Sequence, residues 1–370
     1  MTKKILFCTP FSLSHGGGIP RCSRNIFEYY EKEDKKDIEL DVMPMDRKYL
    51  VGQKTSFLKR VLDGTIEYFS IIRKIRKKVK RGNYDIVQIA SSASLSLFKD
   101  YLCVRMLQQK KVTSIIHFHF GRIPDIITIN GWEWKMIKNV AKYATRVIVI
   151  DQSSYDALIQ QGITNVDYLP NPLSPTTEAL ANQCSTLPRS DNTVLFVGHV
   201  IKSKGVFELV EACGTISDIK VKFVGLCKEE TKTELTNLAN NYPKKDWIEF
   251  TGNLSAEEVI KEMCKCTIFA LPTYTEGFPN VILESMASGC PIITTKVGAI
   301  PEMLDIDNSN NNGICIAPQN VDELRTAILH LLNYPEFAKS CGENARQRVK
   351  KMYSMPIIWE RMCSIWKLTQ

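Results

Sequence analysis

The stretch that decides the fold runs from Tyr274 to Leu304 and reads YTEGFPNVILESMASGCPIITTKVGAIPEML. The apolar residues 268–271 just before it predict a strand, and Gly277 predicts a turn. Apolar residues then follow helical spacing over 281–287, and a second apolar run comes after that helix. The stretch therefore predicts strand, turn, helix and strand, an order typical of a parallel α/β sheet.

Two carboxylates bracket the predicted turn. Glu276 lies where the strand ends, and Glu284 lies about one turn inside the helix, so both face the crevice above the carboxyl edge of the sheet. The helix start offers backbone N–H groups to a diphosphate, and Gly277 lets a ligand approach closely. An ionised carboxylate can accept hydrogen bonds from two vicinal hydroxyls. The pattern suits a sugar-nucleotide, although two solvated glutamates at a helix end are the alternative.

The wider string resembles the donor-site signature of retaining glycosyltransferases of family 4. The matching elements are Glu276-(x)7-Glu284, Gly277-Phe278, Ala287-x-Gly289-x-Pro291 and Gly298-x-x-x-Glu302. The resemblance implies an α/β GT-B fold, in which two Rossmann-like domains with parallel sheets face each other. It implies that Glu276 holds sugar hydroxyls and Glu284 the ribose of the donor. The other donor-binding residues implied here are Gly277, Phe278, Pro279 and Asn280.

Length and strand spacing predict two domains. The chain has 370 residues, 44% of them hydrophobic, which is enough for two cores. The predicted strands are 5–8, 38–43, 86–90, 114–118, 147–150 and 166–169, then 194–197, 221–224, 248–250, 268–271, 292–294 and 314–316. The polar segment 170–192 between the two series predicts a linker. With the resembled fold, this predicts an acceptor domain at 1–175, completed by a crossover helix at 355–370, and a donor domain at 176–354.

Cysteine usage and hydropathy indicate the compartment. Twelve cysteines without repeated C-x-x-C pairs favour buried thiols in a reducing compartment over a disulfide framework or a zinc site. The first apolar run, 5–8, is too short for a signal peptide, and no run approaches the roughly 18 residues of a transmembrane helix. We expect a cytoplasmic protein with peripheral contact to the inner face of the membrane.

Two loops of the first domain carry candidate site residues. The sequence HGGGI at 15–19 fits a flexible loop, but it also matches the family's glycine loop facing the donor phosphate, best at Gly17 and Gly18. His117 and His119 lie on the same face of one predicted strand. Ordinary packed histidines are one reading. The resemblance places a catalytic histidine near the donor sugar, and His119 is the better match.

The start of the second domain resembles the family's Gly-Arg-(x)n-Lys-Gly element. A glycine turn followed by lysines at a helix start suits a pyrophosphate, because cations there neutralise the leaving group. Lys204 matches the family lysine, whereas His199 stands where arginine is frequent and is mostly neutral at pH 7. Lys202 or Arg122 would have to supply the missing cation.

The positive charge of the chain is concentrated in its first half. Residues 1–180 contain 28 Lys+Arg and 18 Asp+Glu, a net +10, so the remainder carries −2 of the total of +8. In the segment 54–81, nine basic residues between Lys59 and Arg81 interleave with apolar ones at helical spacing. This segment is either a core-packed helix with a solvated face or a contact for an anionic membrane surface. No nucleic-acid reader motif is present.

The residues and the resemblance together predict a retaining, metal-independent hexosyltransferase. It would move a hexosyl unit from a nucleotide diphosphate sugar, with a UDP-sugar favoured, to a hydroxyl of a lipid-linked or surface-polysaccharide glycan. The catalytic residues would be Glu276, His119 and Lys204, and the sugar-nucleotide is a co-substrate, with no cofactor or metal. The alternatives are a non-catalytic sugar-nucleotide-binding protein and an epimerase of the same fold.

Overall fold

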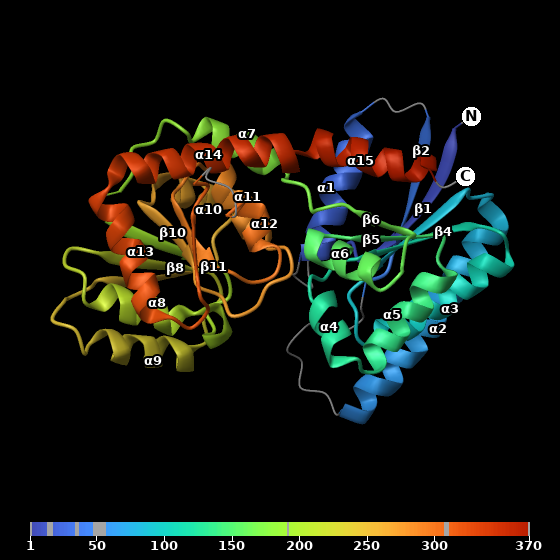
Figure 1. Cartoon of the computed structure of the whole chain (residues 1–370), viewed down its shortest axis with the longest axis horizontal. Helices are drawn as coiled ribbons and strands as arrows, with labels where there is room; N and C mark the ends of the chain where they lie inside the picture. Colours follow the sequence, from blue (N-terminus) through green and yellow to red (C-terminus); the bar gives the residue numbers. More distant parts are fainter. Residues whose placement is uncertain are drawn as a thin grey trace. The chain divides into compact units, whose positions relative to one another are not determined.

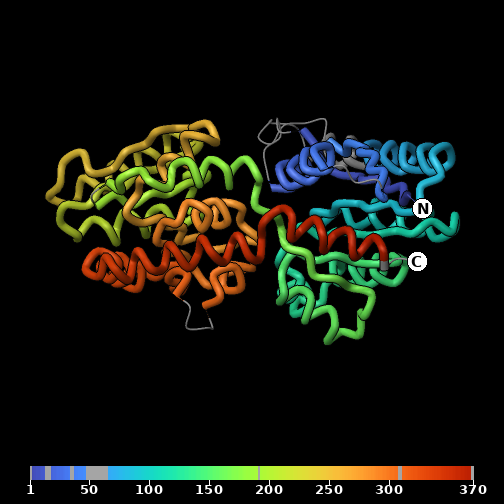
Figure 2. The backbone as a smooth tube through the Cα atoms, turned by 90° about the horizontal axis from the view of Figure 1, so that it is seen from above, coloured from blue at the N-terminus to red at the C-terminus, as the bar shows by residue number. Residues whose placement is uncertain are grey.

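The computed structural model describes residues 2–12, 18–33, 37–46, 57–190, 192–306 and 311–368, and within these the side chains of all residues except 57–65 and 368. The chain divides into two compact units, one of residues 1–172 with 358–370 and one of residues 173–357 (Figure 1). The backbone passes between the units twice, and these crossings can be followed in green and in red in Figure 2.

A six-stranded sheet forms the centre of the first unit. Its strands are β1 (Lys3–Thr9), β2 (Ile38–Pro44), β3 (Ile86–Ser91), β4 (Thr113–Phe118), β5 (Arg146–Val149) and β6 (Val166–Tyr168). They lie in the order β2-β1-β3-β4-β5-β6, and each neighbouring pair is parallel. Successive side chains of a strand point to opposite faces of the sheet. Both faces of this sheet are apolar, so both need helices to cover them.

Three helices lie side by side on one face of this sheet (Figure 1). The helices of the first half of the chain are α1 (Gly18–Lys32), α2 (Phe57–Gly82), α3 (Ser96–Gln109), α4 (Ile123–Ile129), α5 (Trp132–Tyr143) and α6 (Gln152–Gln160). The three that lie together are α2, α3 and α5. Ile71, Ile75 and Val79 of α2 are buried with Val87 and Ile89 of β3, which explains the helical spacing of apolar residues in this segment.

The C-terminal helix α15 (Met355–Leu368) completes the core of the first unit. Trp359 lies against Tyr29 and Tyr30 of α1, with ring centroids 5.9 and 6.0 Å away. The indole Nε1 of Trp366 donates a hydrogen bond of 2.7 Å to Gln88 Oε1 on β3. The helix predicted at the end of the chain is therefore present and packs through its apolar face.

The second unit contains the other six-stranded parallel sheet. Its strands are β7 (Thr193–Val197), β8 (Lys220–Val224), β9 (Ile248–Gly252), β10 (Ile268–Leu271), β11 (Ile292–Thr295) and β12 (Ile314–Ile316). Their order is β12-β11-β10-β7-β8-β9, the order of a doubly wound Rossmann sheet. Helices cover both faces: α8 (Val206–Gly214), α9 (Glu229–Ala239) and α13 (Val321–Asn333) on one, and α10 (Ala256–Lys265), α11 (Asn280–Ala287) and α14 (Pro335–Tyr353) on the other (Figure 1).

All twelve predicted strands are confirmed, but the predicted linker is wrong over much of its length. Helix α7 (Pro175–Gln183) lies within 170–192 and packs against α10 and α11 of the second unit. Pro175 occupies a first-turn position, where a proline favours a helix start, and Ala181 is buried. The polar composition of this short helix hid it, because only one of its faces is covered.

The cysteines are mostly buried thiols, as predicted. All twelve are free, and nine of them are buried. Burial raises the pKa of Cys22 and Cys213 to about 12, so these thiols are neutral at pH 7. They act as small apolar core residues.

Candidate active site

The candidate site of the second unit lies where the order of its strands reverses. Strand β7 neighbours β10, with β8 and β9 beyond it on one side and β11 and β12 beyond β10 on the other. Helices α8 and α11, which follow β7 and β10, therefore lie on opposite faces of the sheet, and ligands bind in the crevice that such a reversal creates. The β7 loop (198–205) carries His199 and Lys204, and the β10 loop (272–279) carries Glu276 and Gly277.

A close backbone contact fixes the two loops against each other. Gly205 has a φ of +71°, and a Cβ atom there would lie 1.9 Å from the carbonyl oxygen of Pro272. A glycine is required on both counts. Residues 202–204 just before it form a single turn of 3-10 helix, and Tyr274 N donates to the Ser203 carbonyl oxygen at 2.9 Å. The β7 loop is thus attached to the start of the β10 loop.

Lys204 and Glu276 form an ion pair between the two loops. The distance between Lys204 Nζ and Glu276 Oε1 is 2.5 Å, and the side chains are 26% and 16% exposed. The pair remains accessible to a ligand that could be bound by both groups. The sequence predicted each residue separately, and the structure brings them together.

Tyr274 supports this arrangement and was missed in the sequence. Its hydroxyl donates to Glu208 Oε1 of α8 at 2.5 Å. Burial, and then the Glu208 carboxylate, raise the pKa of Tyr274 to about 12, so it is a neutral donor at pH 7. The two residues are 66 positions apart, and the available sequence signal is an aromatic residue just before the Thr-Glu-Gly turn.

Gly298, in the loop after β11, lies directly behind Glu276. Its φ is +55°, and a Cβ atom there would lie 2.2 Å from the Glu276 carbonyl oxygen and 2.7 Å from that of Gly277. The next residue, Ala299, donates its N–H to the Gly277 carbonyl oxygen at 2.9 Å. The glycine of the Gly-x-x-x-Glu element therefore positions the backbone that carries the acidic residue.

The start of α11 follows this acidic turn. Pro279 is its N-cap and has no side-chain acceptor, so it cannot cap the first turn. Phe278 is only 7% exposed and packs edge-on against Tyr353, with ring centroids 5.7 Å apart. Phe278 and Pro279 can therefore offer a ligand mainly backbone groups. Asn280 and Glu284 are half-buried on the helix itself.

His199 is exposed at the end of β7. Its neighbour Val200 donates its N–H to the Leu226 carbonyl oxygen at 2.9 Å, so the loops after β7 and β8 are joined. Of the two cations considered as replacements for the missing arginine, Lys202 is exposed in the 3-10 turn. Arg122 belongs to the first unit and pairs with Glu133 there, with 2.9 Å between Arg122 Nη2 and Glu133 Oε1.

The first unit holds the candidate histidines at the carboxyl end of β4. His119 N donates to the Ser91 carbonyl oxygen of β3 at 2.9 Å, and the rings of His117 and His119 have centroids 3.9 Å apart. Burial lowers the pKa of both imidazoles, that of His119 to about 4, with Asn171 opposing the effect. Both are therefore neutral at pH 7. Within the described part of the chain, neither ring nitrogen of His117 has a hydrogen-bond partner.

The remaining predicted residues belong to the glycine loop. Gly18 is the first residue of α1, and Gly17 lies outside the described residues. Gly18 and His119 belong to the first unit, whereas the Lys204–Glu276 pair belongs to the second. Within the ranges that the structure describes, no three His, Cys, Asp or Glu side chains are grouped as metal ligands.

Sequence comparisons relate the second unit to glycosyltransferases. Residues 181–348 match the family described as glycosyl transferases group 1. An uncharacterised glycosyltransferase of Methanocaldococcus jannaschii is 32% identical over 239 residues, which cover 62% of this chain and 64% of that protein. The capsular polysaccharide biosynthesis glycosyltransferase CapM of Staphylococcus aureus is 28% identical over 187 residues, 48% of this chain and 46% of that protein. The matches thus span about two thirds and half of the length of these relatives.

Solved structures match both units. The sucrose-phosphate synthase of Thermosynechococcus elongatus has a TM-score of 0.74 at 17% identity, covering 99% of this chain and 98% of that one. HepE of Anabaena, crystallised in complex with UDP, has a TM-score of 0.71 at 16% identity, covering 99% and 100%. The chain has the GT-B fold. The predicted fold class of two Rossmann-like domains is therefore confirmed.

None of the helices in the described ranges combines the length and the apolar composition needed to cross a bilayer.

Proposed function

We propose that this GT-B protein is a retaining glycosyltransferase that transfers a hexosyl unit from a nucleotide diphosphate sugar to a hydroxyl acceptor. The observation that carries the proposal is the Lys204–Glu276 pair at the switch point of the second sheet, beside the start of α11. The family match over 181–348 covers both residues and supports a glycosyltransferase. A UDP-sugar is favoured, and the likeness of the fold to that of HepE, crystallised with UDP, is consistent with it.

Lys204 and the N-terminus of α11 are assigned to the diphosphate. As the bond from the sugar's anomeric carbon to the phosphate breaks, negative charge grows on the departing phosphate oxygens. A fixed ammonium group and backbone N–H groups stabilise that charge in the transition state, which is where preorganised donors contribute most. Lys204 is held in place by its ion pair with Glu276, so little reorganisation is needed on donor binding.

Glu276 is assigned to the sugar hydroxyls, and Glu284 to the ribose. Ionised carboxylates accept hydrogen bonds from two vicinal hydroxyls, and Glu284 lies within α11, after the turn that carries Glu276. His119 is assigned to the donor sugar as a neutral imidazole, which can donate one hydrogen bond and accept another. His199 and Gly18 are further candidates for the phosphates.

The proposed reaction is a front-face substitution. The acceptor oxygen forms its bond to the anomeric carbon on the face from which the phosphate leaves, through an oxocarbenium-like state. The proton of the acceptor hydroxyl passes to a departing phosphate oxygen, and the configuration at the anomeric carbon is retained. No step requires a metal ion.

The proposed acceptor is a lipid-linked or surface-polysaccharide glycan at the cytoplasmic face of a membrane. The partial likeness to CapM, a capsular polysaccharide biosynthesis enzyme, supports this class. Six cations of α2 are exposed and would attract anionic lipid headgroups. They are Arg73, Lys74, Arg76, Lys77, Lys80 and Arg81. The predicted segment began at residue 54, and 54–56 lie outside the described residues.

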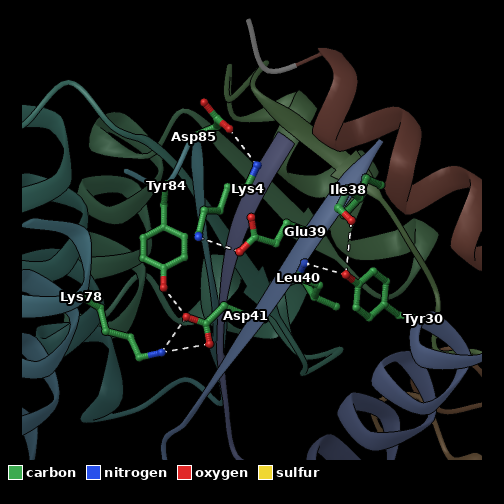
Figure 3. Close-up of polar contacts among 9 residues, drawn as sticks. All are labelled: Lys4, Tyr30, Ile38, Glu39, Leu40, Asp41, Lys78, Tyr84 and Asp85. Atoms are coloured by element: carbon green, nitrogen blue, oxygen red, sulfur yellow. Dashed lines mark hydrogen bonds and ion pairs between the residues drawn. The ribbon is translucent and has the colours of Figure 1, made fainter. Parts of the chain in front are cut away.

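One cation of α2 has a structural partner instead. Lys78 Nζ lies 2.7 Å from Asp41 Oδ2 of β2, and the Tyr84 hydroxyl donates to the same oxygen (Figure 3). Burial opposes ionisation of Asp41, but the bonds from Lys78 and Tyr84 outweigh it and hold the pKa of this carboxyl below its usual value. Lys78 therefore fastens α2 to the edge strand, and we assign no lipid contact to it.

A transfer assay tests the proposed reaction. The purified protein would be incubated with an α-linked UDP-hexose and a lipid-linked monosaccharide acceptor, and the released UDP and the product anomer would be measured by NMR. We expect acceptor-dependent release of UDP and an α-linked product. A β-linked product would refute retention. Nucleotide binding without turnover across a broad acceptor panel would favour the non-catalytic alternative.

A further inference from the structure

Five large apolar side chains form an exposed patch on the first unit. Leu95, the N-cap of α3, and Phe98 and Leu102 within the helix follow one another at helical spacing. Ile129 and Trp132 lie at the end of α4 and the start of α5. They are between 43% and 77% exposed. The rings of Phe98 and Trp132 stack, with centroids 5.7 Å apart and an interplanar angle of 14°, which joins α3 to α5. We call these five residues the α3–α5 patch.

This patch differs from the scattered apolar residues of an ordinary surface. Single exposed apolar side chains need no explanation, but neighbouring ones mark interaction sites. A stacked aromatic pair that stays about half exposed is a rigid apolar surface without a cover among the described residues. Ile129, the most exposed at 77%, precedes Asn130, whose φ of 52° ends α4.

The surroundings of the patch are cationic. On the described side chains of α2, α3 and α5, ten lysines and arginines are exposed, and no acidic residue is. Arg105, Lys135, Lys138 and Lys142 from α3 and α5 join the six of α2. Glu133, beside Trp132, is only partly exposed and pairs with Arg122. On α4, Asp125 is exposed one turn before Ile129 and is the single exposed acidic side chain among the described residues of these four helices. An apolar aromatic patch on helices with this excess of exposed cations is complementary to an anionic bilayer surface.

A second copy of the chain fits this surface poorly. A symmetric dimer through the patch would bring the surrounding cations of both copies together, and like charges across an interface cost free energy. Nucleic acid would be attracted by the cations and could stack on Phe98 and Trp132, but it would leave the exposed aliphatic side chains of Leu95, Leu102 and Ile129 without an apolar partner. A bilayer accommodates both features, since the aliphatic and aromatic side chains enter the headgroup boundary while the cations meet the lipid phosphates.

We propose that the α3–α5 patch inserts into the headgroup region of an anionic membrane. Helix α3 starts where β3 ends, so the patch lies toward the carboxyl edge of the first sheet, the edge at which His119 follows β4. A lipid-linked acceptor would then rise from the bilayer toward the predicted acceptor side of the site. The inference rests on the proposed function for the identity of this acceptor, but membrane insertion itself can be measured without any donor.

Trp132 provides a selective probe. The chain has five tryptophans, and the other four are at most 5% exposed, whereas Trp132 is 48% exposed. Emission of the full-length protein would be recorded during titration with vesicles of phosphatidylglycerol and phosphatidylcholine, alongside vesicle pelleting. We expect a blue shift and quenching by lipids brominated on the acyl chains. Trp132→Phe should abolish the blue shift of tryptophan emission, while the protein should still pellet with the vesicles.

A second variant tests the contribution of the patch to affinity. Phe98→Ser should weaken vesicle binding about tenfold, because roughly half a phenylalanine side chain is no longer buried. Leu329→Ser on α13 is the matched control, since this leucine is exposed in the second unit, and it should leave binding unchanged. Melting temperatures of both variants would verify folding, and a nucleotide-binding assay without vesicles reports separately on the proposed function.

Three outcomes would overturn the inference. Vesicle pelleting without a shift of Trp132 emission would mean a purely electrostatic contact elsewhere. Equal binding by a folded Phe98→Ser protein would mean that the patch does not insert. A blue shift that grows with protein concentration in the absence of lipid would identify a second copy as the occupant.

Discussion

We propose that the Lys204–Glu276 ion pair, which is partly exposed, serves ligand binding more than stability. Exposed ion pairs contribute about 0–1 kcal/mol to folding, so an accessible pair with 2.5 Å between its charged atoms needs another reason for its position. A sugar diphosphate supplies one, because its hydroxyls match the carboxylate and its phosphates match the ammonium group. When the ligand binds, each of the two side chains can replace its ion-pair partner by a group of the ligand without moving far.

Replacing Lys204 by methionine should therefore reduce turnover more than folding. We expect kcat to fall by about 10²–10³-fold, the usual effect of losing one transition-state stabiliser, while the melting temperature changes little. Steady-state release of UDP would measure it. Lys220→Met, at the amino end of β8 on the opposite edge of the sheet, is the control. An unchanged kcat in Lys204→Met would contradict the proposed catalytic role of Lys204.

Gly298 offers a test of the backbone support behind Glu276. Gly298→Ala should destabilise the protein by about 3 kcal/mol, because the new Cβ meets the Glu276 carbonyl oxygen in an already strained left-handed conformation, and it should weaken nucleotide binding. Urea unfolding and a binding titration would measure both. Gly162→Ala is the matched control, since its φ is +79° but open space surrounds it, and it should cost only about 1 kcal/mol. Equal losses in the two variants would contradict the close approach.

The partly buried His119 predicts a dependence of stability on pH. Its pKa is about 4 in the folded chain against 6.5 for an ordinary histidine, so the unfolded chain takes up the proton first as pH falls. Above pH 6.5 His119 is neutral in both the folded and the unfolded chain, so its titration costs no stability. Between pH 6.5 and about 4 only the unfolded chain takes up the proton, and the free energy of unfolding falls progressively. His119→Asn should reduce that loss by roughly 3 kcal/mol in urea melts at several pH values. Parallel pH profiles for both proteins would contradict this account.

Some site residues could be predicted from the sequence and others could not. Glu276, Glu284 and Lys204 follow strand ends and a glycine turn, so local patterns place them at a sheet edge. The Tyr274–Glu208 hydrogen bond depends on packing between loops 66 positions apart, which leaves no local signal. Phe278 belongs to the matched signature, yet its ring is directed into the core against Tyr353.

At the scale of elements, short apolar runs were sufficient to predict the strands. Both sheets are covered on both faces, which makes these runs continuous. Apolar periodicity failed for α7, a polar helix with one covered face. The sequence pattern also could not distinguish Lys78, which forms an ion pair, from the exposed cations of α2. That division depends on Asp41 of β2, which reaches Lys78 from another element (Figure 3).

The exposed cations of α2 lead to a prediction about membrane attachment. A variant with Arg73, Lys74 and Lys77 changed to Glu should lose most of its pelleting with anionic vesicles at low salt, since each cation near the surface contributes about 1 kcal/mol. Lys78 is left unchanged to keep its bond to Asp41. Changing Lys228, Lys245 and Lys351 of the second unit to Glu alters the charge equally and is the control. Equal pelleting of the two triple variants would refute a specific contact through α2.

At the scale of the whole molecule, the distribution of charge between the two units agrees with their proposed roles. The net +10 of residues 1–180 belongs largely to the unit assigned to a membrane-bound acceptor, and the −2 of the remainder largely to the unit assigned to the donor. The chain passes between the units at 172–173 and 357–358, and its last helix belongs mainly to the first unit. The assignment of donor and acceptor roles to the two units stays a prediction.

We propose that the second unit binds a nucleotide diphosphate sugar through Glu276, Lys204 and α11. The most direct test of this claim is a thermal-shift measurement with UDP, GDP, ADP and their common sugars on wild type, Glu284→Ala and the exposed control Glu234→Ala. A ligand at 100 times its dissociation constant should stabilise the protein by about 2.7 kcal/mol. We predict a shift with the UDP series that Glu284→Ala abolishes and Glu234→Ala keeps. The claim is contradicted if no nucleotide shifts the wild type under conditions in which a known transferase responds.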